Sequence, residues 1–234
     1  MKAILLDIEG TTTPIDFVHR TLFPFARERM ADFVAENFDV LASEIVSLKI
    51  EYEKDYAGKF YTKKFDENAA DLISSYLVFL VDEDRKSTAL KSIQGKIWEK
   101  DYESGELKSI VFDDVPQAFD RWNEQGKTLA IYSSGSVLAQ ELIFKYSNHG
   151  DLTGFITSYF DTNIGGKKDA ASYKNIAVTL DFPAAEITFV SDIAAELDAA
   201  KIAGMQTVLS FREGNAPLDA ENEHQIIKSF DELN

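Results

Sequence analysis

Short apolar runs that end in polar residues recur along the chain and predict buried β-strands. The runs are rich in Leu, Ile, Val and Phe, which is typical of strands covered on both faces. The predicted strands are residues 2–6, 128–134, 154–162, 186–192 and 205–211, and we expect the last of these to be the final strand.

Amphipathic segments lie between these strands and predict helices. Apolar residues recur at spacings of three and four in residues 115–126, 136–150, 172–182 and 194–204. The first segment has Pro116 near its start and Gly126 at its end, as helices often do. Strands that alternate with helices predict an α/β fold, a Rossmann-like doubly wound parallel sheet with helices on both faces.

The alternation is interrupted between Pro14 and about Lys108. This stretch contains no convincing buried strand but has four charged, helix-periodic segments: residues 22–38, 42–56, 67–81 and 87–102. We therefore predict two domains. Residues 1–16 and 108–234 form the α/β core, and residues 17–107 form a helical cap inserted after the first strand, with a loop at 56–68.

The composition narrows the possible partners and compartments. A formal charge of −16 disfavours phosphate backbones and anionic lipids, so we expect binding to neither nucleic acid nor membranes. The sequence has no cysteine, which excludes a disulfide scaffold and a thiolate zinc site and suggests a reducing cytoplasm. No apolar run approaches the ~20 residues of a membrane span, and the N-terminus does not resemble a signal peptide. Nothing indicates a repeating interface, so we expect a monomer.

Polar side chains with complementary chemistry follow the predicted strands. In a parallel sheet these positions gather at one edge, beyond the carboxyl ends of the strands, where ligands bind. They comprise two acids, two hydroxyls, a cation and a third acid: Asp7, Glu9, Ser133, Ser134, Lys167 and Asp192.

Such a set can transfer a phosphoryl group through an aspartate. A carboxylate such as Asp7 can attack phosphorus if its charge is screened. One Mg²⁺ held by Asp7 and Asp192 would provide that screening, because hard oxygen ligands suit this ion. Lys167 would neutralise further phosphate charge, and the Ser133 hydroxyl would bind phosphate oxygens. Glu9 is placed to protonate the leaving oxygen and then to activate water.

The same residues carry a resemblance to a known superfamily. "DIEGT" resembles Asp-x-Asp-x-Thr, the first motif of the haloacid dehalogenase (HAD) superfamily, with Glu9 at the second acid position. Ser133, Lys167 and Asp192 match its second, third and fourth motifs in order. The resemblance implies a HAD-like fold with an inserted cap.

Within that superfamily the chain is similar to the enolase-phosphatases, also called acireductone synthases. The likeness extends over nearly the whole chain and includes "IQGKIWEKDYESGELKSIVFDDVPQAFDRW", "IYSSGSVLAQELIF", "FDTNIGGKKDAASY" and "GNAPL". It implies an enzyme of methionine salvage that enolises 2,3-diketo-5-methylthiopentyl-1-phosphate and then removes the phosphate, giving an acireductone.

The resemblance also implies roles for individual residues. Asp7 and Glu9 are expected to be catalytic, and Asp7, Glu9 and Asp192 are expected to bind one Mg²⁺, with Glu9 acting through its backbone carbonyl. The phosphate-binding residues are expected to be Ser133, Ser134 and Lys167.

Simpler interpretations stay open for several of these residues. Asp7 alone could be a solvated acid at a strand end, and the two serines could cap a helix. Spacing does not separate Lys167 from Lys168, although the family pattern favours the first. Glu196, one helical turn after Asp192, could support the metal or be an exposed acid. The histidines His19, His149 and His224 share no ligand spacing and are interpreted as surface or structural residues.

Four alternative functions differ in how well they fit the predicted cap and the motifs. Another small-molecule HAD phosphatase, without the enolase step, would carry the same core motifs. A dehalogenase would need no metal and would leave Asp192 without a purpose. A phospho-accepting receiver would carry its acceptor aspartate on a middle strand, where this chain has Ser133. A catalytically inactive binding module is disfavoured because no motif position is lost.

Overall fold

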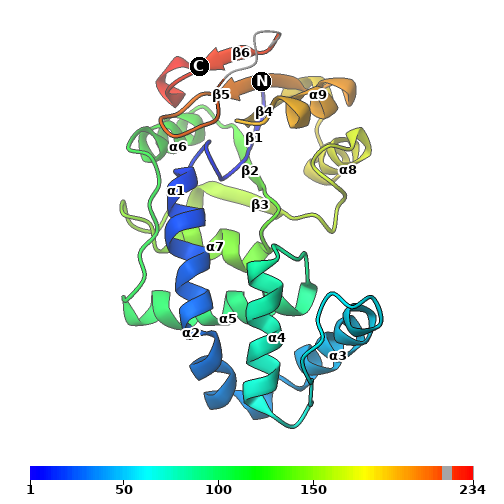
Figure 1. Ribbon diagram of the computed structural model, residues 1–234. Coiled ribbons are helices and arrows are strands. Elements are labelled where there is room, and N and C mark those ends of the chain that lie inside the picture. The colour runs from blue at the N-terminus through cyan, green and yellow to red at the C-terminus, as the bar shows by residue number, and fades with distance from the viewer. Residues whose placement is uncertain (218–222, 234) are drawn as a thin grey trace. The chain divides into compact units, whose positions relative to one another are not determined.

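The computed structural model describes residues 1–217 and 223–233 (Figure 1). The chain divides into two compact units. The sheet unit comprises Met1–His19 and Lys108–Asn234, and the helical unit comprises Arg20–Leu107. The division predicted from the sequence, 1–16 and 108–234 against 17–107, differs from these bounds by three residues at the first boundary and coincides at the second.

The sheet unit is built on a parallel sheet in the order β3-β2-β1-β4-β5-β6. Its strands are β1 (Ala3–Leu6), β2 (Thr128–Tyr132), β3 (Ile156–Phe160), β4 (Ile187–Ser191), β5 (Gln206–Ser210) and β6 (Gln225–Ile227). The five predicted strands and their parallel arrangement are confirmed. The prediction that residues 205–211 form the last strand is wrong, because β6 follows. That strand has only three residues, of which one is buried, so it shows no apolar pattern.

Helices cover both faces of the sheet. They are α6 (Asp114–Glu124), α7 (Val137–Lys145), α8 (Ala170–Leu180) and α9 (Ala194–Ile202), with short turns α1 (Ile15–Phe17), η3 (Thr153–Phe155), η4 (Ala184–Glu186) and η5 (Phe230–Glu232). On one face Leu5 and Phe189 share an apolar cluster with Tyr173 of α8 and with residues of α9. On the other face Phe119 of α6 lies 6.1 Å from Phe144 of α7, measured between ring centroids. The sheet is therefore doubly wound, as predicted.

The strand register determines which residues meet at the carboxyl edge. Leu6 of β1 is level with Ile131 of β2 on one side and with Val190 of β4 on the other. The chain adds β2 and β3 on one side of β1 and then crosses to add β4 on the other. Ligands of open α/β sheets bind where the strand order reverses in this way. The residue after Leu6, Asp7, stands at that point.

The helical unit contains four long helices. They are α2 (Phe23–Glu36), α3 (Ala42–Ala57), α4 (Ala70–Asp82) and α5 (Thr88–Ser104), with the π-helical turn η1 (Val18–Leu22) leading into α2 and the turn η2 (Phe38–Val40) after it. Trp98 and Tyr102 of α5 are both buried, and the Trp98 indole N–H donates to the Leu22 carbonyl at 2.9 Å. Within the described residues, every helix falls short of the length and apolar character needed to cross a bilayer.

One buried carboxylate joins two helices of this unit. Glu44 of α3 accepts hydrogen bonds from Lys96 and Ser92 of α5, both at 2.7 Å, and from Ser43 at 2.8 Å. Burial by itself would raise the pKa of Glu44, but these donors lower it to about 2. The folded state therefore favours the ionised carboxylate more strongly than the unfolded state does.

Replacing Glu44 by Gln should lower the free energy of unfolding by about 2 kcal/mol at pH 7. Because the folded pKa lies below the ordinary value, this stabilisation is complete above about pH 4.5 and is lost as the pH falls toward 2. Urea unfolding of both proteins at pH 7 and pH 3 measures the effect. Glu36→Gln, which breaks an exposed pair with Lys100, is the matched control and should cost less than about 0.5 kcal/mol. An equal cost for the two variants would contradict the argument.

Candidate active site

The first strand ends in a tight turn that orients the Asp7 carboxylate. The backbone N–H groups of Thr11, Thr12 and Thr13 all donate to the Ile8 carbonyl, at 2.9–3.2 Å. The Thr12 hydroxyl adds a bond to the Asp7 carbonyl at 3.2 Å, and the Ile8 N–H donates to Asp7 Oδ1 at 2.8 Å. Asp7 is only 4% exposed. The threonine run thus closes the turn that holds a buried acid in one orientation.

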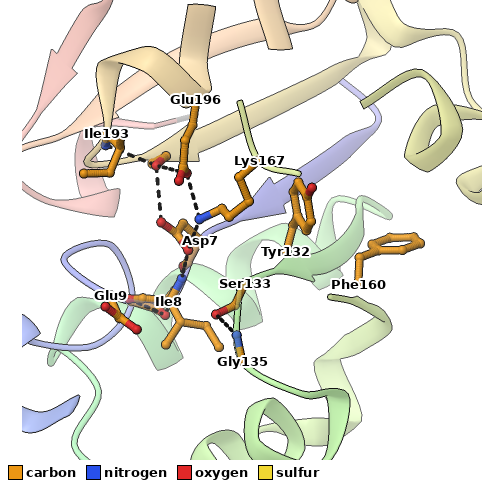
Figure 2. Close-up of polar contacts among 12 residues, drawn as sticks. Asp7, Ile8, Glu9, Tyr132, Ser133, Gly135, Phe160, Lys167, Ile193 and Glu196 are labelled. Carbon is orange, nitrogen blue, oxygen red and sulfur yellow. Dashed lines mark hydrogen bonds and ion pairs between the residues drawn. The ribbon is translucent and has the colours of Figure 1, made fainter. Parts of the chain in front are cut away.

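Lys167 places a positive charge against this acid. Its Nζ lies 2.7 Å from Asp7 Oδ1 and 2.7 Å from Glu196 Oε2, and Figure 2 shows it between the two carboxylates. Burial alone would lower the pKa of Lys167, but the charges of Asp7 and Glu196 outweigh it and raise that pKa above its ordinary value. Lys168 is exposed. Of the two adjacent lysines, the structure brings Lys167 into the site.

The loop that carries Lys167 is held by hydroxyl groups. Tyr173 donates to the Lys167 carbonyl at 2.6 Å, and Tyr132 donates to the Gly165 carbonyl at 2.8 Å. Gly165 has a φ of 136°, and a side chain there would collide with the hydroxyl of Ser172. Only glycine fits this position, so the path of the loop is closely defined.

Ser191 also lies between the two carboxylates. Its hydroxyl lies 3.0 Å from Glu196 Oε2 and 3.3 Å from Asp7 Oδ2, so its single proton serves one carboxylate at a time. The hydroxyl also accepts a bond from the Ile193 N–H at 3.2 Å. Burial, followed by the charge of Asp7, raises the pKa of Glu196. Glu196 is therefore a buried part of the site and not an exposed helix acid.

Asp192 follows β4 and lies against the turn after Asp7. A Cβ atom added at Gly10 would stand 2.5 Å from Asp192 Oδ2, so this carboxylate occupies the space beside the glycine. Gly10 also has a φ of 65°, which favours glycine. Burial, and then the negative charge of Asp7, raise the pKa of Asp192 to about 7. The site thus has more acid than its one lysine can neutralise.

The two serines after β2 have different environments. Ser133 is buried, and its hydroxyl accepts a hydrogen bond from the Gly135 N–H at 3.3 Å (Figure 2). Ser134 is exposed. Neither caps the following helix, because Ser136 is the residue whose side chain accepts from the first turn of α7. The Gln140 amide group donates to the carbonyls of Gly135 and of the neighbouring strand β3, which holds the loop against the sheet.

Glu9 points away from this cluster toward a histidine. Its Oε2 lies 3.3 Å from His19 Nε2, and its side chain is 34% exposed. Burial and the charge of Asp7 raise the pKa of Glu9, whereas His19 opposes the shift. A partly accessible carboxyl group with a raised pKa can exchange protons with a ligand.

The donor set at this edge fits a magnesium ion. Among residues 1–217 and 223–233, no three acidic or histidine side chains group closely enough to ligate a metal alone. Asp7 and Asp192 supply two carboxylates on neighbouring strands, and their mutual repulsion is what a divalent cation would relieve. Mg²⁺ commonly takes one or two carboxylates and completes its shell with other oxygens. A Glu9 ligand would then be its backbone carbonyl, since its carboxylate is paired with His19.

Three contributors were not recognised in the sequence. Ser191 bonds Asp7 across 184 residues, His19 pairs with Glu9, and Asn215 donates to the Gly10 carbonyl across 205 residues. Ser191 directly precedes Asp192, so its place beside a motif was a usable signal. Asn215 lies within "GNAPL", one of the stretches that carry the family resemblance, which was also a usable signal. His19 had none, because a single histidine in a polar segment matches no spacing rule.

Sequence similarity to known proteins extends over the full chain. A family model of haloacid dehalogenase-like hydrolases matches residues 1–204. The chain is 50% identical to the enolase-phosphatase E1 of Synechococcus elongatus, covering 100% of this chain and 98% of the relative. It is 43% identical to the enolase-phosphatase E1 of Drosophila willistoni, covering 100% and 96%.

Solved structures agree with this relationship. The UTR4 protein of Saccharomyces cerevisiae has a TM-score of 0.81 and 33% identity, with 99% of each chain covered. CbbY of Rhodobacter sphaeroides in complex with phosphate has a TM-score of 0.59 and 15% identity, covering 100% of this chain and 96% of that one. The latter likeness shows the shared fold alone.

Replacing Lys167 by Met should destabilise the metal-free protein by about 3 kcal/mol at pH 7, because it leaves Asp7 and Glu196 buried without a counter-ion. Urea unfolding in EDTA measures this loss. The exposed neighbour provides the control, since Lys168→Met should change the free energy of unfolding by less than about 0.5 kcal/mol. Equal stability of the two variants would show that Lys167 does not hold the two acids together.

Proposed function

We infer the function from one premise: the chain belongs to the enolase-phosphatase E1 family of haloacid dehalogenase-like hydrolases. The resemblance seen in the sequence is thereby confirmed, and the chain is an enzyme. We propose that its substrate is 2,3-diketo-5-methylthiopentyl-1-phosphate and its product the acireductone 1,2-dihydroxy-3-keto-5-methylthiopentene. The observation that carries the assignment of the reacting groups is the 2.7 Å approach of Lys167 to Asp7 at the carboxyl end of β1.

Asp7 is the proposed nucleophile. One of its carboxylate oxygens attacks phosphorus, and the bond between phosphorus and the ester oxygen breaks. Lys167, the buried cation beside Asp7, draws the phosphate into the site and neutralises part of its charge. Ser133 and Ser134, with backbone N–H groups of their loop, bind the remaining phosphate oxygens. The product of this step is an aspartyl phosphate and the enol form of the leaving molecule.

Glu9 is the proposed proton carrier. Its carboxyl group gives a proton to the departing ester oxygen, then takes one from the water that hydrolyses the aspartyl phosphate. Phosphate leaves and the Asp7 carboxylate is restored. The raised pKa of Glu9 favours the protonated form that the first of these steps needs.

The family's phosphatases are typically magnesium-dependent, and we propose one Mg²⁺ per chain. The Asp7 and Asp192 carboxylates and the Glu9 carbonyl would hold it. When bound, the ion would supply positive charge that screens Asp7 from the phosphate and polarises substrate oxygens.

The enolase step can use the same site. A proton leaves the carbon that bears the phosphate ester, and the neighbouring carbonyl oxygen gains one. Negative charge on that oxygen is stabilised by the same cationic groups that bind the phosphoryl group. Glu9 and a residue of the helical unit are both candidates for the group that removes the proton.

We propose that residues 17–107 act as a cap that excludes water from the substrate during these steps. Cytoplasmic location and a monomeric state stay predictions from the sequence. Absence of nucleic-acid and membrane partners is likewise an expectation from the charge of −16.

Asp7→Asn should reduce phosphate release from the diketone phosphate by at least about 10³-fold in saturating Mg²⁺, because an amide oxygen is a poor nucleophile. Steady-state release of inorganic phosphate measures the loss. Asp120→Asn, an exposed acid on α6, is the matched control and should retain full activity. Full turnover by Asp7→Asn would end the assignment of the nucleophile.

The alternative, a HAD phosphatase without the enolase step, differs in the order of its products. Stopped-flow mixing with excess enzyme should show enol absorbance before phosphate appears. Removal of Mg²⁺ with EDTA should suppress phosphate release and readdition should restore it. Phosphate release with no preceding enol signal would favour the alternative.

A further inference from the structure

Asn215, in the loop after β5, is joined to the turn that carries Asp7 and Glu9. Its Nδ2 donates to the Gly10 carbonyl at 2.9 Å and to the Ser210 carbonyl at 3.1 Å. Both partners are carbonyl oxygens, which only accept hydrogen bonds. The NH₂ group must therefore face them, and the side-chain oxygen must face the opposite way. The orientation of this amide is fixed by its partners.

The amide oxygen of Asn215 points to the edge of the proposed metal site. A Cβ atom added at Gly10 would stand 2.9 Å from Asn215 Oδ1 and 2.5 Å from Asp192 Oδ2, so the two oxygens flank the same point in space. Asn215 Oδ1 is buried and has no hydrogen-bond partner among the described residues. Leaving a buried acceptor without a donor destabilises the folded protein.

Support of the turn does not by itself explain this cost. The Ser210 hydroxyl also donates to the Gly10 carbonyl, at 3.1 Å, so the turn already has a side-chain donor. Unlike Ser210, Asn215 also carries an amide oxygen, and this oxygen lies beside the Asp192 carboxylate. A ligand that brings a hydrogen-bond donor to this point would remove the penalty. Magnesium ions in proteins usually retain several waters, and groups that bind such waters contribute to metal affinity.

We propose that Asn215 is a positioning residue of the magnesium site: its amide oxygen accepts a hydrogen bond from the ion's hydration shell while its NH₂ group holds the Gly10 carbonyl. The inference rests on the proposed function, since it takes Asp7 and Asp192 as ligands of the ion. Glycine at position 10 leaves room for both oxygens, because a Cβ atom there would stand within 3 Å of each of them.

Calorimetric titration of the full-length, EDTA-treated protein with MgCl₂ tests the proposal. Asn215→Ala should weaken Mg²⁺ binding about tenfold or more. Ser210→Ala removes the other side-chain donor to the same carbonyl, and it should change Mg²⁺ affinity less than twofold. Asn215→Asp keeps an oxygen but loses both amide hydrogen bonds, so its melting temperature in EDTA should fall while its Mg²⁺ affinity stays at or above that of the wild type.

The results distinguish a failure of the Asn215 role from a failure of the magnesium site. Both Asn215→Ala and Ser210→Ala could melt at a lower temperature and still bind Mg²⁺ with wild-type affinity. Asn215 would then only stabilise the backbone of the Gly10 turn, and the inference alone would be wrong. Asp192→Asn should abolish the Mg²⁺ binding of the wild type. If the wild type does not bind Mg²⁺, or if Asp192→Asn binds it equally well, both the metal site and the inference are wrong. Should Asn215→Ala fail to fold, Asn215→Ser gives the same comparison, because its shorter side chain withdraws the acceptor.

Discussion

The contact between one lysine and two buried acids is the interaction on which the site depends. Lys167 lies 2.7 Å from both Asp7 and Glu196, and Asp192 adds a third acid nearby. Burying like charges is costly unless they are paired and hydrogen-bonded. A single lysine neutralises only part of the charge of these acids, so the edge of the sheet retains a surplus of negative charge. The surplus is suited to a divalent cation, and the lysine is suited to a phosphate.

The parallel sheet makes this concentration of charge possible. Because β1 lies between β2 and β4, the residues after three neighbouring strands reach the same edge. The groups come from distant parts of the chain, yet each is held by short local contacts: a threonine turn for Asp7, a tyrosine hydroxyl for the Lys167 loop, a serine hydroxyl for Glu196. Local rigidity on a rigid sheet supplies the preorganisation that electrostatic catalysis requires.

Glycines at two turns of the site leave room for neighbouring side chains. At Gly10 and Gly165 a Cβ atom would meet the Asp192 carboxylate and the Ser172 hydroxyl respectively. Both positions have positive φ, so sterics and backbone conformation agree. The backbone approaches the acids closely at the first position and lets the lysine loop turn at the second. The Asp192 carboxylate and the Ser172 hydroxyl occupy space that a side chain at these positions would fill.

Patterns in the sequence were enough to predict the parallel α/β architecture, the inserted helical segment and the acids, serines and lysine at the strand ends. These features depend on local periodicity and on motif spacing, which are visible in one chain. Which groups meet depends on the folded chain, as three contacts show: Glu9 with His19, Ser191 with Asp7, and the Asn215 amide with the Gly10 carbonyl. The structure also revealed β6, whose three residues are too few for a pattern. Contacts between residues some 200 positions apart arise from packing of the whole sheet, and no local pattern encodes them.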